Sequence, residues 1–425
     1  MTTAPDPVHE AAEEVLATSY GRLVAYLAAR SGDLAAAEDA LADAVEAALR
    51  TWPSRGVPDR PEAWLLTAAR RRLIAAARHR GVAERAAPSL VVLADEAAER
   101  ATTPSGFPDE RLGLLFACTH PAIDERVRAP LMLQTVLGLD AARIASAFVV
   151  APSTMGQRLV RAKAKVKAAG VPFTVPGPDQ LGDRLGSVLE AVYAAYGTGW
   201  DDLDGRDPRR AGLAVEAERL AGVVVELAPH EPEARGLAAL IGHCEARRPA
   251  RRDTSGGFVP LTEQDTDRWD HPRIAAADAL LGGVGTNDAE GRFVLEARIQ
   301  SAHNARRRTG ATDWAAVGAL YDRLLVVAPT VGAAVAAAAA WGEARGPAVG
   351  LARLDALPVD RVEGYQPAWA LRADLARRLG LADVALEAYD RAIGLSDDPA
   401  VRAFLLGRRA EVAAPPGGLA LDRAV

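Results

Sequence analysis

Apolar residues recur with the helical period of about 3.6 residues along most of the chain. In the first part this period predicts helices at 8–30, 34–52 and 61–80, the last with Pro61 at or near its first position. Further helices are predicted at 109–118, 125–136, 140–147 and 152–168. Because helical periodicity dominates throughout, the pattern predicts an all-α fold.

Segments that interrupt the period predict boundaries. Residues 53–61 hold three prolines and a glycine and are predicted to be a loop. Residues 81–108 are rich in Ala, Pro and Glu with weak periodicity, which predicts a linker, and the Pro-rich stretch 171–178 marks a second boundary. The expected parts of the chain are 1–82, 83–108, 109–170 and 180–413.

The last of these parts has the pattern of a long helical array. A repeat of about 34 residues is visible near its end, at 314–346, 348–380 and 382–412. Gly346 and Gly380 are predicted to end helices one period apart. Thirty-four residues is about the length of a tetratricopeptide helix pair, but the full consensus is absent. We therefore expect TPR-like repeats.

Composition supports the helical prediction and limits the class of protein. Half of the chain is apolar (49%), aromatic residues make up only 5%, and Ala, Leu, Arg and Glu are abundant. Cys118 and Cys244 stand far apart without a CxxC motif, which argues against a disulfide framework or a structural zinc site. No signal-peptide pattern or membrane-length apolar run is found, so we expect a soluble cytoplasmic protein with no membrane contact.

Charge is distributed unevenly. The net charge is −6. Residues 1–170 hold 21 basic and 20 acidic residues, or +1, and the remainder holds 29 and 36, or −7. Any contact with nucleic acid is therefore expected in the first part, in local basic clusters.

The strongest local signal lies at 139–167. It predicts a helix at 140–147, a tight turn at 148–151 and a second helix from Pro152. The residues expected to pack the two helices together are Ile144, Ala145, Met155, Leu159 and Ala162. This pattern is typical of a DNA-binding helix-turn-helix, whose second helix enters the major groove.

The second helix carries side chains suited to DNA. Those placed to meet base edges are Ser153, Thr154, Gln157 and Arg158. Those suited to phosphate contact are Arg161, Lys163, Lys165 and Lys167, which include all three lysines of the chain. The alternative is an amphipathic helix pair whose basic end is simply solvated.

A second basic cluster lies on the predicted third helix. It consists of Arg70, Arg71, Arg72, Arg78 and Arg80, close in sequence to Trp64. An aromatic side chain, arginines and a neighbouring loop suit unstacked single-stranded bases. The alternative is a solvated arginine-rich face, because the whole protein is rich in arginine.

These segments together resemble a known family. Residues 39–52 and 61–74 look like region 2 of extracytoplasmic-function sigma factors, which belong to group 4 of the sigma-70 family, and the helix-turn-helix looks like their region 4. Residues 107–123 are similar to a signature of one subgroup, whose members carry a long C-terminal TPR-like extension. Residues 259–270 and 312–325 resemble that extension.

The resemblance implies an alternative sigma factor that binds core RNA polymerase and promoter DNA. Asp39, Asp43 and Glu46 would bind the β′ clamp, and region 4 would contact the β flap. The loop at 52–61, with Trp64, Arg70, Arg71, Arg72 and Arg78, would hold melted −10 bases. The helix from Pro152 would recognise the −35 element, through Ser153, Thr154, Gln157, Arg158, Arg161, Lys163 and Lys165. The linker would run toward the polymerase catalytic channel.

Enzyme and metal functions find little support in the sequence. The acidic run Glu263, Asp265, Asp267, Asp270 and His271 matches no EF-hand loop. Cys118 is predicted to be a buried core residue rather than a nucleophile paired with His120. We therefore expect no cofactor, no metal and no catalysis.

The expected function is transcription initiation controlled by the C-terminal array, which would also offer a site for a protein partner. One alternative is a stand-alone helix-turn-helix regulator with a TPR-like sensor domain. Another is an interaction scaffold.

Overall fold

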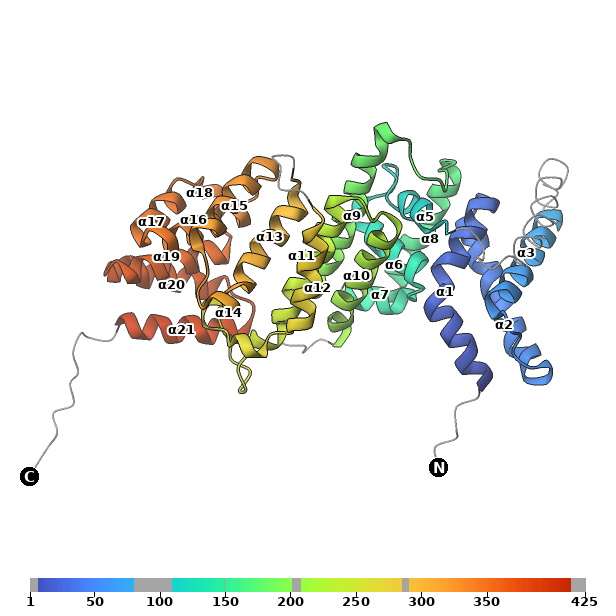
Figure 1. Cartoon of the computed structure of the whole chain (residues 1–425), viewed down its shortest axis with the longest axis horizontal. Helices are drawn as coiled ribbons and strands as arrows, with labels where there is room; N and C mark the ends of the chain where they lie inside the picture. Colours follow the sequence, from blue (N-terminus) through green and yellow to red (C-terminus); the bar gives the residue numbers. More distant parts are fainter. Residues whose placement is uncertain (1–6, 80–108, 149, 201–207, 285–289, 414–425) are drawn as a thin grey trace, which may run out of the picture. The chain divides into compact units, whose positions relative to one another are not determined.

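The computed structural model describes residues 7–79, 109–148, 150–200, 208–284 and 290–413. Within these ranges the secondary structure consists of helices and one isolated β-bridge, between Arg252 and Phe258 (Figure 1). The prediction of an all-α fold is confirmed. The chain divides into two compact units, residues 1–229 (unit 1) and 230–425 (unit 2), which are described separately.

Unit 1 contains α1 (Pro7–Ser31), α2 (Leu34–Arg55), α3 (Pro61–His79), α5 (Arg111–Cys118), α6 (Glu125–Leu137), α7 (Ala141–Ala147), α8 (Pro152–Ala168), α9 (Pro178–Trp200) and α10 (Pro208–Leu227). Local sequence explains several of these bounds. The carboxylates of Asp33, Asp124 and Asp140 accept backbone N–H groups at the starts of α2, α6 and α7. Gly138 follows α6 in the left-handed conformation, with φ 73°.

The predicted loop at 53–61 begins later than expected, because α2 continues through Pro53 to Arg55. Pro53 lies in the last turn, where it removes only one backbone hydrogen bond. Gly56, with φ 79°, then donates its N–H to the Trp52 carbonyl at 2.9 Å. Trp52 is buried and packs edge-on against Trp64 at 5.6 Å between ring centroids, which anchors this turn on α3.

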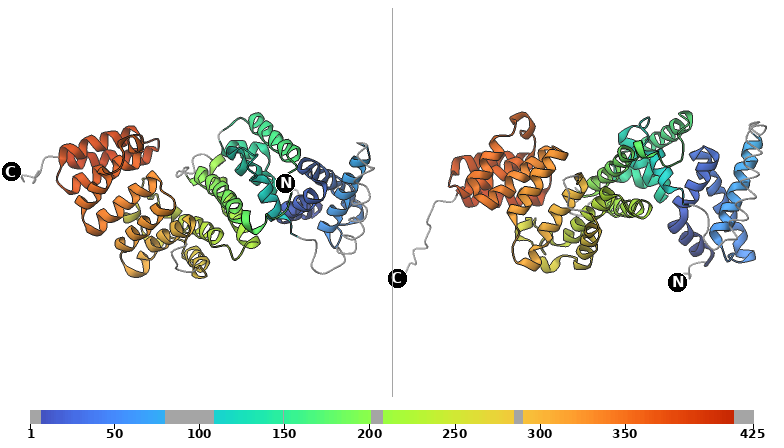
Figure 2. Two further views of the ribbon diagram at one scale, coloured as in Figure 1. Left: turned by 90° about the horizontal axis from the view of Figure 1, so that it is seen from above. Right: turned by 45° about the horizontal axis from the view of Figure 1, so that its top comes forward.

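Helices α1, α2 and α3 pack together as a small bundle (Figure 2). Its core includes the continuous buried stretch from Leu23 to Ala28, with Leu41 and Trp52. Helix α1 also packs so closely against α6 that the backbones of the two helices nearly touch at Gly21 and Val136. A Cβ atom on Gly21 would lie 2.2 Å from the Val136 carbonyl oxygen, so only glycine fits there.

Helices α9 and α10 pack against each other and against α5, α6 and α7. Gly113 of α5 also closely approaches the segment before α9, since a Cβ atom there would lie 2.5 Å from the Phe173 carbonyl oxygen. The Arg184 guanidinium of α9 donates to the Phe116 carbonyl. The sequence after residue 170 therefore contributes directly to the core of unit 1.

Unit 2 contains α11 (Pro232–Arg247), α12 (His271–Gly282), α13 (Arg292–Asn304), α14 (Arg306–Thr309), α15 (Trp314–Val327), α16 (Val331–Arg345), α17 (Pro347–Asp355), α18 (Val359–Val362), α19 (Gln366–Arg378), α20 (Ala382–Gly394) and α21 (Pro399–Ala413), with three short 3-10 turns between α11 and α12. Its successive long helices stack side by side (Figure 2). Gly346 and Gly380 follow α16 and α19 with φ of 101° and 74°, one predicted period apart. The TPR-like classification stays a prediction.

The polar segment between α11 and α12 makes hydrogen bonds within itself and contacts with the last helix, α21. The Asp253 carboxylate accepts the N–H groups of Ser255 and Gly257, each at 2.8 Å. Arg252 pairs with Asp398 at 2.6 Å, and Phe258 packs edge-on against Phe404 at 5.5 Å. The ion pair and the aromatic contact join the segment that follows α11 to the last helix of unit 2, α21. No helix in the described ranges is both long and apolar enough to cross a membrane.

Candidate nucleic-acid interface

Helix α8 separates buried and exposed side chains along its length. Its apolar side packs inward through Met155, Leu159, Ala162 and Val166. On α7, Ile144 and Ala145 are buried as well, so the five residues expected to pack these helices are buried as predicted. The outward side presents Ser153, Thr154, Gln157, Arg158 and Arg161, all exposed.

The start of each helix follows from local sequence. Asp140 accepts the Arg143 N–H at 2.8 Å before α7, and Pro152 occupies the first turn of α8 after the extended Ala151. Residue 149 lies outside the described residues, so the predicted turn at 148–151 is described only in part. The arrangement could place the exposed side of α8 against a DNA groove, and its DNA-binding role stays a prediction.

Two lysines of α8 are paired with acidic residues of α2 and of its N-cap. Lys163 donates to Glu38, and both side chains are nearly buried, at 12% and 13% exposed. Lys167 donates to Asp33 at 2.6 Å. Lys165 is exposed. The structure therefore brings the predicted −35 helix against the predicted polymerase-binding helix.

The environment of the Lys163–Glu38 pair is poorly solvated. Burial, with the nearby Asp39, raises the pKa of Glu38, although the Lys163 ammonium opposes this effect. Burial also raises the pKa of Tyr20 and raises the pKa of Cys118 to about 12. Cys118 is fully buried as predicted, and its thiol lies 3.3 Å from the Thr135 hydroxyl. Such a thiol is held as the unreactive neutral form.

Sequence reasoning missed Glu38 and Asp33 as partners of α8. The acidic side of α2 and the lysine spacing of α8 were both visible, because Lys163 and Lys167 stand one turn apart. However, Lys163 and Glu38 are 125 positions apart in the chain. Complementary charge on two helices does not by itself reveal that they meet.

The residues predicted to bind polymerase lie on the exposed side of α2. Asp39, Asp43 and Glu46 are all exposed, and Glu46 has only a distant contact with Arg50, at 3.9 Å. Asp39 also lines a groove of about 670 Å³ within unit 1, together with Arg143 and other residues of α1, α2, α6, α7 and α10.

The predicted −10 residues of α3 lie beside those acids. Trp64 is half-buried against Trp52, and Arg71 and Arg72 are exposed. Arg72 lies 3.9 Å from Asp43, which links the two predicted sets. Arg70 is half-buried and engaged in contacts of its own. The side chain of Arg78 and the whole of Arg80 lie outside the described residues.

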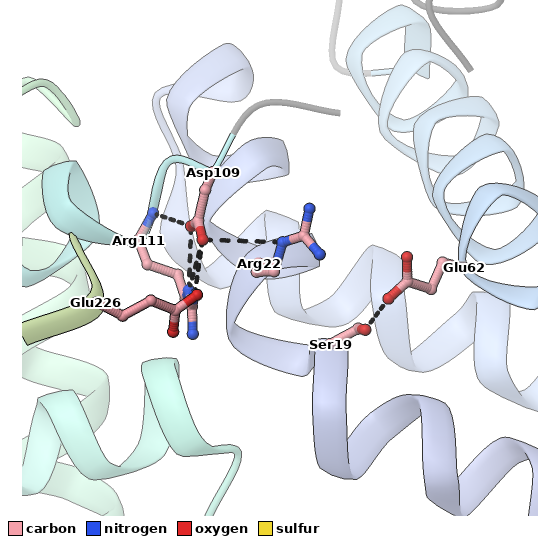
Figure 3. Close-up of polar contacts among 6 residues, drawn as sticks. All are labelled: Ser19, Arg22, Glu62, Asp109, Arg111 and Glu226. Atoms are coloured by element: carbon pink, nitrogen blue, oxygen red, sulfur yellow. Dashed lines mark hydrogen bonds and ion pairs between the residues drawn. The ribbon is translucent and has the colours of Figure 1, made fainter. Parts of the chain in front are cut away.

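A second charged network joins α1, α5 and α10 (Figure 3). Arg111 donates to Asp109 at 2.7 Å and to Glu226 at 3.0 Å, and Arg22 lies 3.8 Å from Asp109. Burial alone would raise the pKa of Asp109, but the Arg111 hydrogen bonds and the charges of Arg111 and Arg22 hold it below its usual value. Figure 3 also shows Ser19 of α1 donating to Glu62 of α3.

Helix α10 also contacts the predicted helix-turn-helix. The Glu216 carboxylate is 7% exposed and accepts Arg143 of α7 at 2.8 Å and Arg219 at 2.9 Å. With Glu226, it gives α10 ionic contacts to both α5 and α7. The residues that hold α7 in this position therefore come from the segment after residue 170.

The acidic run in unit 2 has structural partners. Glu263 pairs with Arg408, the Asp265 carboxylate accepts the Asp267 N–H, and Asp270 caps α12. Among the described residues, no group of three or more His, Cys, Asp or Glu side chains could hold a metal ion.

Comparison with known proteins agrees with the position of the first bundle. Residues 16–82 match the model of sigma-70 region 2, and residues 184–284 match a family of unknown function, DUF6596. An uncharacterized protein of Rhizobium meliloti (strain 1021), R00370, is 34% identical over 406 residues, which cover 94% of each chain. No solved structure shows a significant match.

The chain belongs to the same family as the Rhizobium protein, and its region 2 supports a place among the sigma-70 family factors. The sigma-70 factors are transcription initiation factors rather than enzymes.

Proposed function

We propose that this protein is an alternative sigma factor of the extracytoplasmic-function group. It binds core RNA polymerase, recognises the −35 and −10 promoter elements and initiates transcription. The observation that carries the proposal is the sigma-70 region 2 match at 16–82, which covers most of α1 and all of α2 and α3. In the same chain it is followed by a helix pair with a polar and basic exposed side.

In this proposal α2 and α3 divide two tasks. The exposed acids Asp39, Asp43 and Glu46 bind the β′ clamp. Trp64 and the exposed Arg71 and Arg72 hold the melted −10 strand, by stacking and by phosphate contact. Unstacking a base costs a few kcal/mol, which these contacts must offset.

In the same proposal, helix α8 recognises the −35 element. Gln157 and Arg158 are exposed near its N-terminal end, where a recognition helix meets base edges. Arg161, Lys163 and Lys165 continue along the helix and suit phosphates, with region 4 also contacting the β flap.

We further propose that the C-terminal helical part, including TPR-like repeats, controls sigma activity. Its first helices, α9 and α10, already pack on α5 to α7, with Glu216 paired to Arg143. In the same unit Lys163 and Lys167 are occupied by α2. We call this pairing of α8 with α2 the closed arrangement. Lys163 would have to leave Glu38 before it could neutralise a phosphate.

The deciding experiment is transcription in vitro with purified core RNA polymerase and a pooled library of genomic fragments. We expect transcripts that depend on the added protein, and their start sites should share two upstream motifs. Asp39→Arg should abolish these transcripts by repelling the clamp contact, whereas Asp183→Arg, the same charge change at an exposed position of α9, should not.

A stand-alone helix-turn-helix regulator makes the opposite prediction. It would bind duplex DNA tightly without polymerase and would give no new transcripts with core polymerase alone. A scaffold would show neither activity. Absence of protein-dependent transcripts across the library, both with the wild type and with Glu38→Arg, in which the pairing of α8 with α2 is broken, therefore overturns the sigma-factor proposal.

A further inference from the structure

One large apolar side chain is exposed on the outward side of α8. Val160 is 67% exposed, although valine is among the residues most often found buried. The other large aliphatic side chains of this helix, Met155, Leu159 and Val166, are each only 1% exposed. Valine is also a poorer helix former than alanine, leucine or arginine. Neither packing nor helix propensity therefore accounts for a valine at this position.

The position of Val160 distinguishes it from an ordinary exposed valine. Residues three or four apart share one face of a helix, and this spacing joins Ser153, Gln157, Val160 and Ala164. All four side chains are exposed, and none carries a charge. They form an uncharged row along the outward side of α8, in which Val160 is the only large apolar member.

Basic residues stand on both sides of this row. The helical period places Arg161 and Lys165 on one side of it, and both are exposed. It places Lys163 and Lys167 on the other side, where they pair with Glu38 and Asp33 in the closed arrangement. Protein–DNA contacts divide in the same way, because phosphate contacts position a protein and base contacts provide specificity. Once α8 leaves α2, the row is the part of the helix that suits the base edges.

The neighbour of Val160 one turn earlier favours a close approach. Gly156 has no side chain, and a Cβ atom there would meet nothing within 4 Å. A short side chain at 160 can therefore come close to a surface that α8 contacts. The valine side chain has only methyl groups and no hydrogen-bonding atom, so it can recognise only an apolar feature. In the major groove that feature is the C5-methyl group of thymine.

We propose that Val160 is a specificity-determining residue, which packs its methyl groups against the C5-methyl group of a thymine in the −35 element. This inference rests on the proposed function and deepens it. Gln157 and Arg158 recognise hydrogen-bonding edges, whereas Val160 adds a requirement for thymine at one position of the element.

Replacing thymine by deoxyuridine tests the contact, because this change removes only the C5-methyl group. Duplexes are first selected from a randomised pool by the full-length protein, with and without core RNA polymerase. Each thymine of the recovered sequence is then replaced singly by dU, on either strand. At one thymine the replacement should weaken binding by the wild type about four-fold, the factor that corresponds to the loss of one buried methyl-sized group.

Val160→Ala attributes this effect to the residue. The variant should bind the thymine duplex about four-fold or more weakly than the wild type and should no longer respond to dU at that one position. Its fold should be intact, because Val160 is exposed and alanine is the better helix former. Val215→Ala, the same change at a 53% exposed valine of α10, is the matched control and should behave as the wild type.

Three results would overturn the inference. They are the recovery of no preferred sequence, unchanged wild-type binding after every dU replacement, and equal losses in the wild type and Val160→Ala at every dU position. The proposed function fails separately. A preferred sequence whose thymine contact depends on Val160, without any transcripts that depend on the protein, would reject the sigma-factor proposal and leave the thymine contact in place.

Discussion

Reversing one charge on α2 should release α8 from the closed arrangement. The change is Glu38→Arg, which replaces the partner of Lys163 by a second cation and adds no lysine to the chain. Glu38 lies outside the residues proposed to bind DNA or polymerase, so the variant perturbs the pairing without removing a proposed contact.

The magnitude follows from the burial of the pair. Both side chains are less than one-seventh exposed, so the charges are screened only in part by water. Removing one partner of a buried ion pair costs about 3–5 kcal/mol, because the remaining charge is left uncompensated, and the reversed charge adds repulsion. We expect the closed arrangement to lose about 3 kcal/mol, or roughly a hundred-fold in its equilibrium constant.

The three lysines of the chain give a direct assay, because all of them lie on α8. Brief labelling with an amine-reactive reagent, followed by peptide mass spectrometry, reports each lysine separately. In the wild type, Lys163 should react at least about ten-fold more slowly than the exposed Lys165, since its ammonium is paired and nearly buried. In Glu38→Arg the two rates should become similar.

Asp183→Arg serves as the matched control, because it makes the same charge change on an exposed part of α9. Affinity for duplex DNA in the absence of polymerase should rise in Glu38→Arg beyond any rise in the control. Equal labelling of Lys163 and Lys165 in the wild type would refute the closed arrangement, and continued protection of Lys163 in Glu38→Arg would refute its dependence on the ion pair.

Three other predictions follow from particular contacts. Gly21→Ala should lower the free energy of unfolding by about 1–3 kcal/mol, because the added Cβ atom would collide with the Val136 carbonyl oxygen. Gly182→Ala on α9 is the control, since its Cβ atom would meet open space and should leave the stability unchanged. Differential scanning calorimetry measures both variants. Trp64→Ala should reduce permanganate-detected −10 opening about ten-fold or more while leaving −35 duplex binding intact. Burial, with the charges of Arg247 and Arg306, lowers the pKa of His303 to about 3, below its ordinary value near 6.5. As the pH falls, the unfolded chain therefore takes up the proton before the folded chain does. The contribution of neutral His303 to the free energy of unfolding should be complete above about pH 6.5 and should fall by up to about 1.4 kcal/mol per pH unit below it. In thermal melts at a series of pH values, His303→Gln should lose less stability per pH unit than the wild type.

Local sequence predicted the helices of unit 1 up to residue 168, because the signals that start and stop them are themselves local, whereas α9 and α10 were expected only as part of a long helical array. Asp33, Asp140 and Pro152 mark helix starts, and the periodic spacing from Met155 to Ala162 correctly separated the buried side of α8 from the exposed side. Pro53 was misleading because a proline in the last turn costs a helix little.

Partners between helices were beyond the same reasoning. The amphipathic pattern of α10 shows that one side is buried, but it does not show that this side meets α5 and α7 rather than the repeats that follow. Glu216 and Glu226 resembled any exposed glutamates of an acidic segment. Their pairing with Arg143 and Arg111 depends on tertiary packing, which a single sequence does not specify.

These contacts give a physical basis for the proposal that the protein restrains α8, its proposed DNA-binding helix. The same Lys163 ammonium cannot pair with Glu38 and neutralise a phosphate at one time. Because α10 holds α7 through Glu216, moving α8 away from α2 requires either bending the α7–α8 pair or loosening α10. In the proposed function, polymerase and promoter binding would have to supply the free energy that breaks the contacts of α8 with α2 and, unless the helix pair bends, the contact of α10 with α7 as well. A signal acting on α10 would change that cost without touching DNA, which makes α10 the place where control from the rest of the chain would enter.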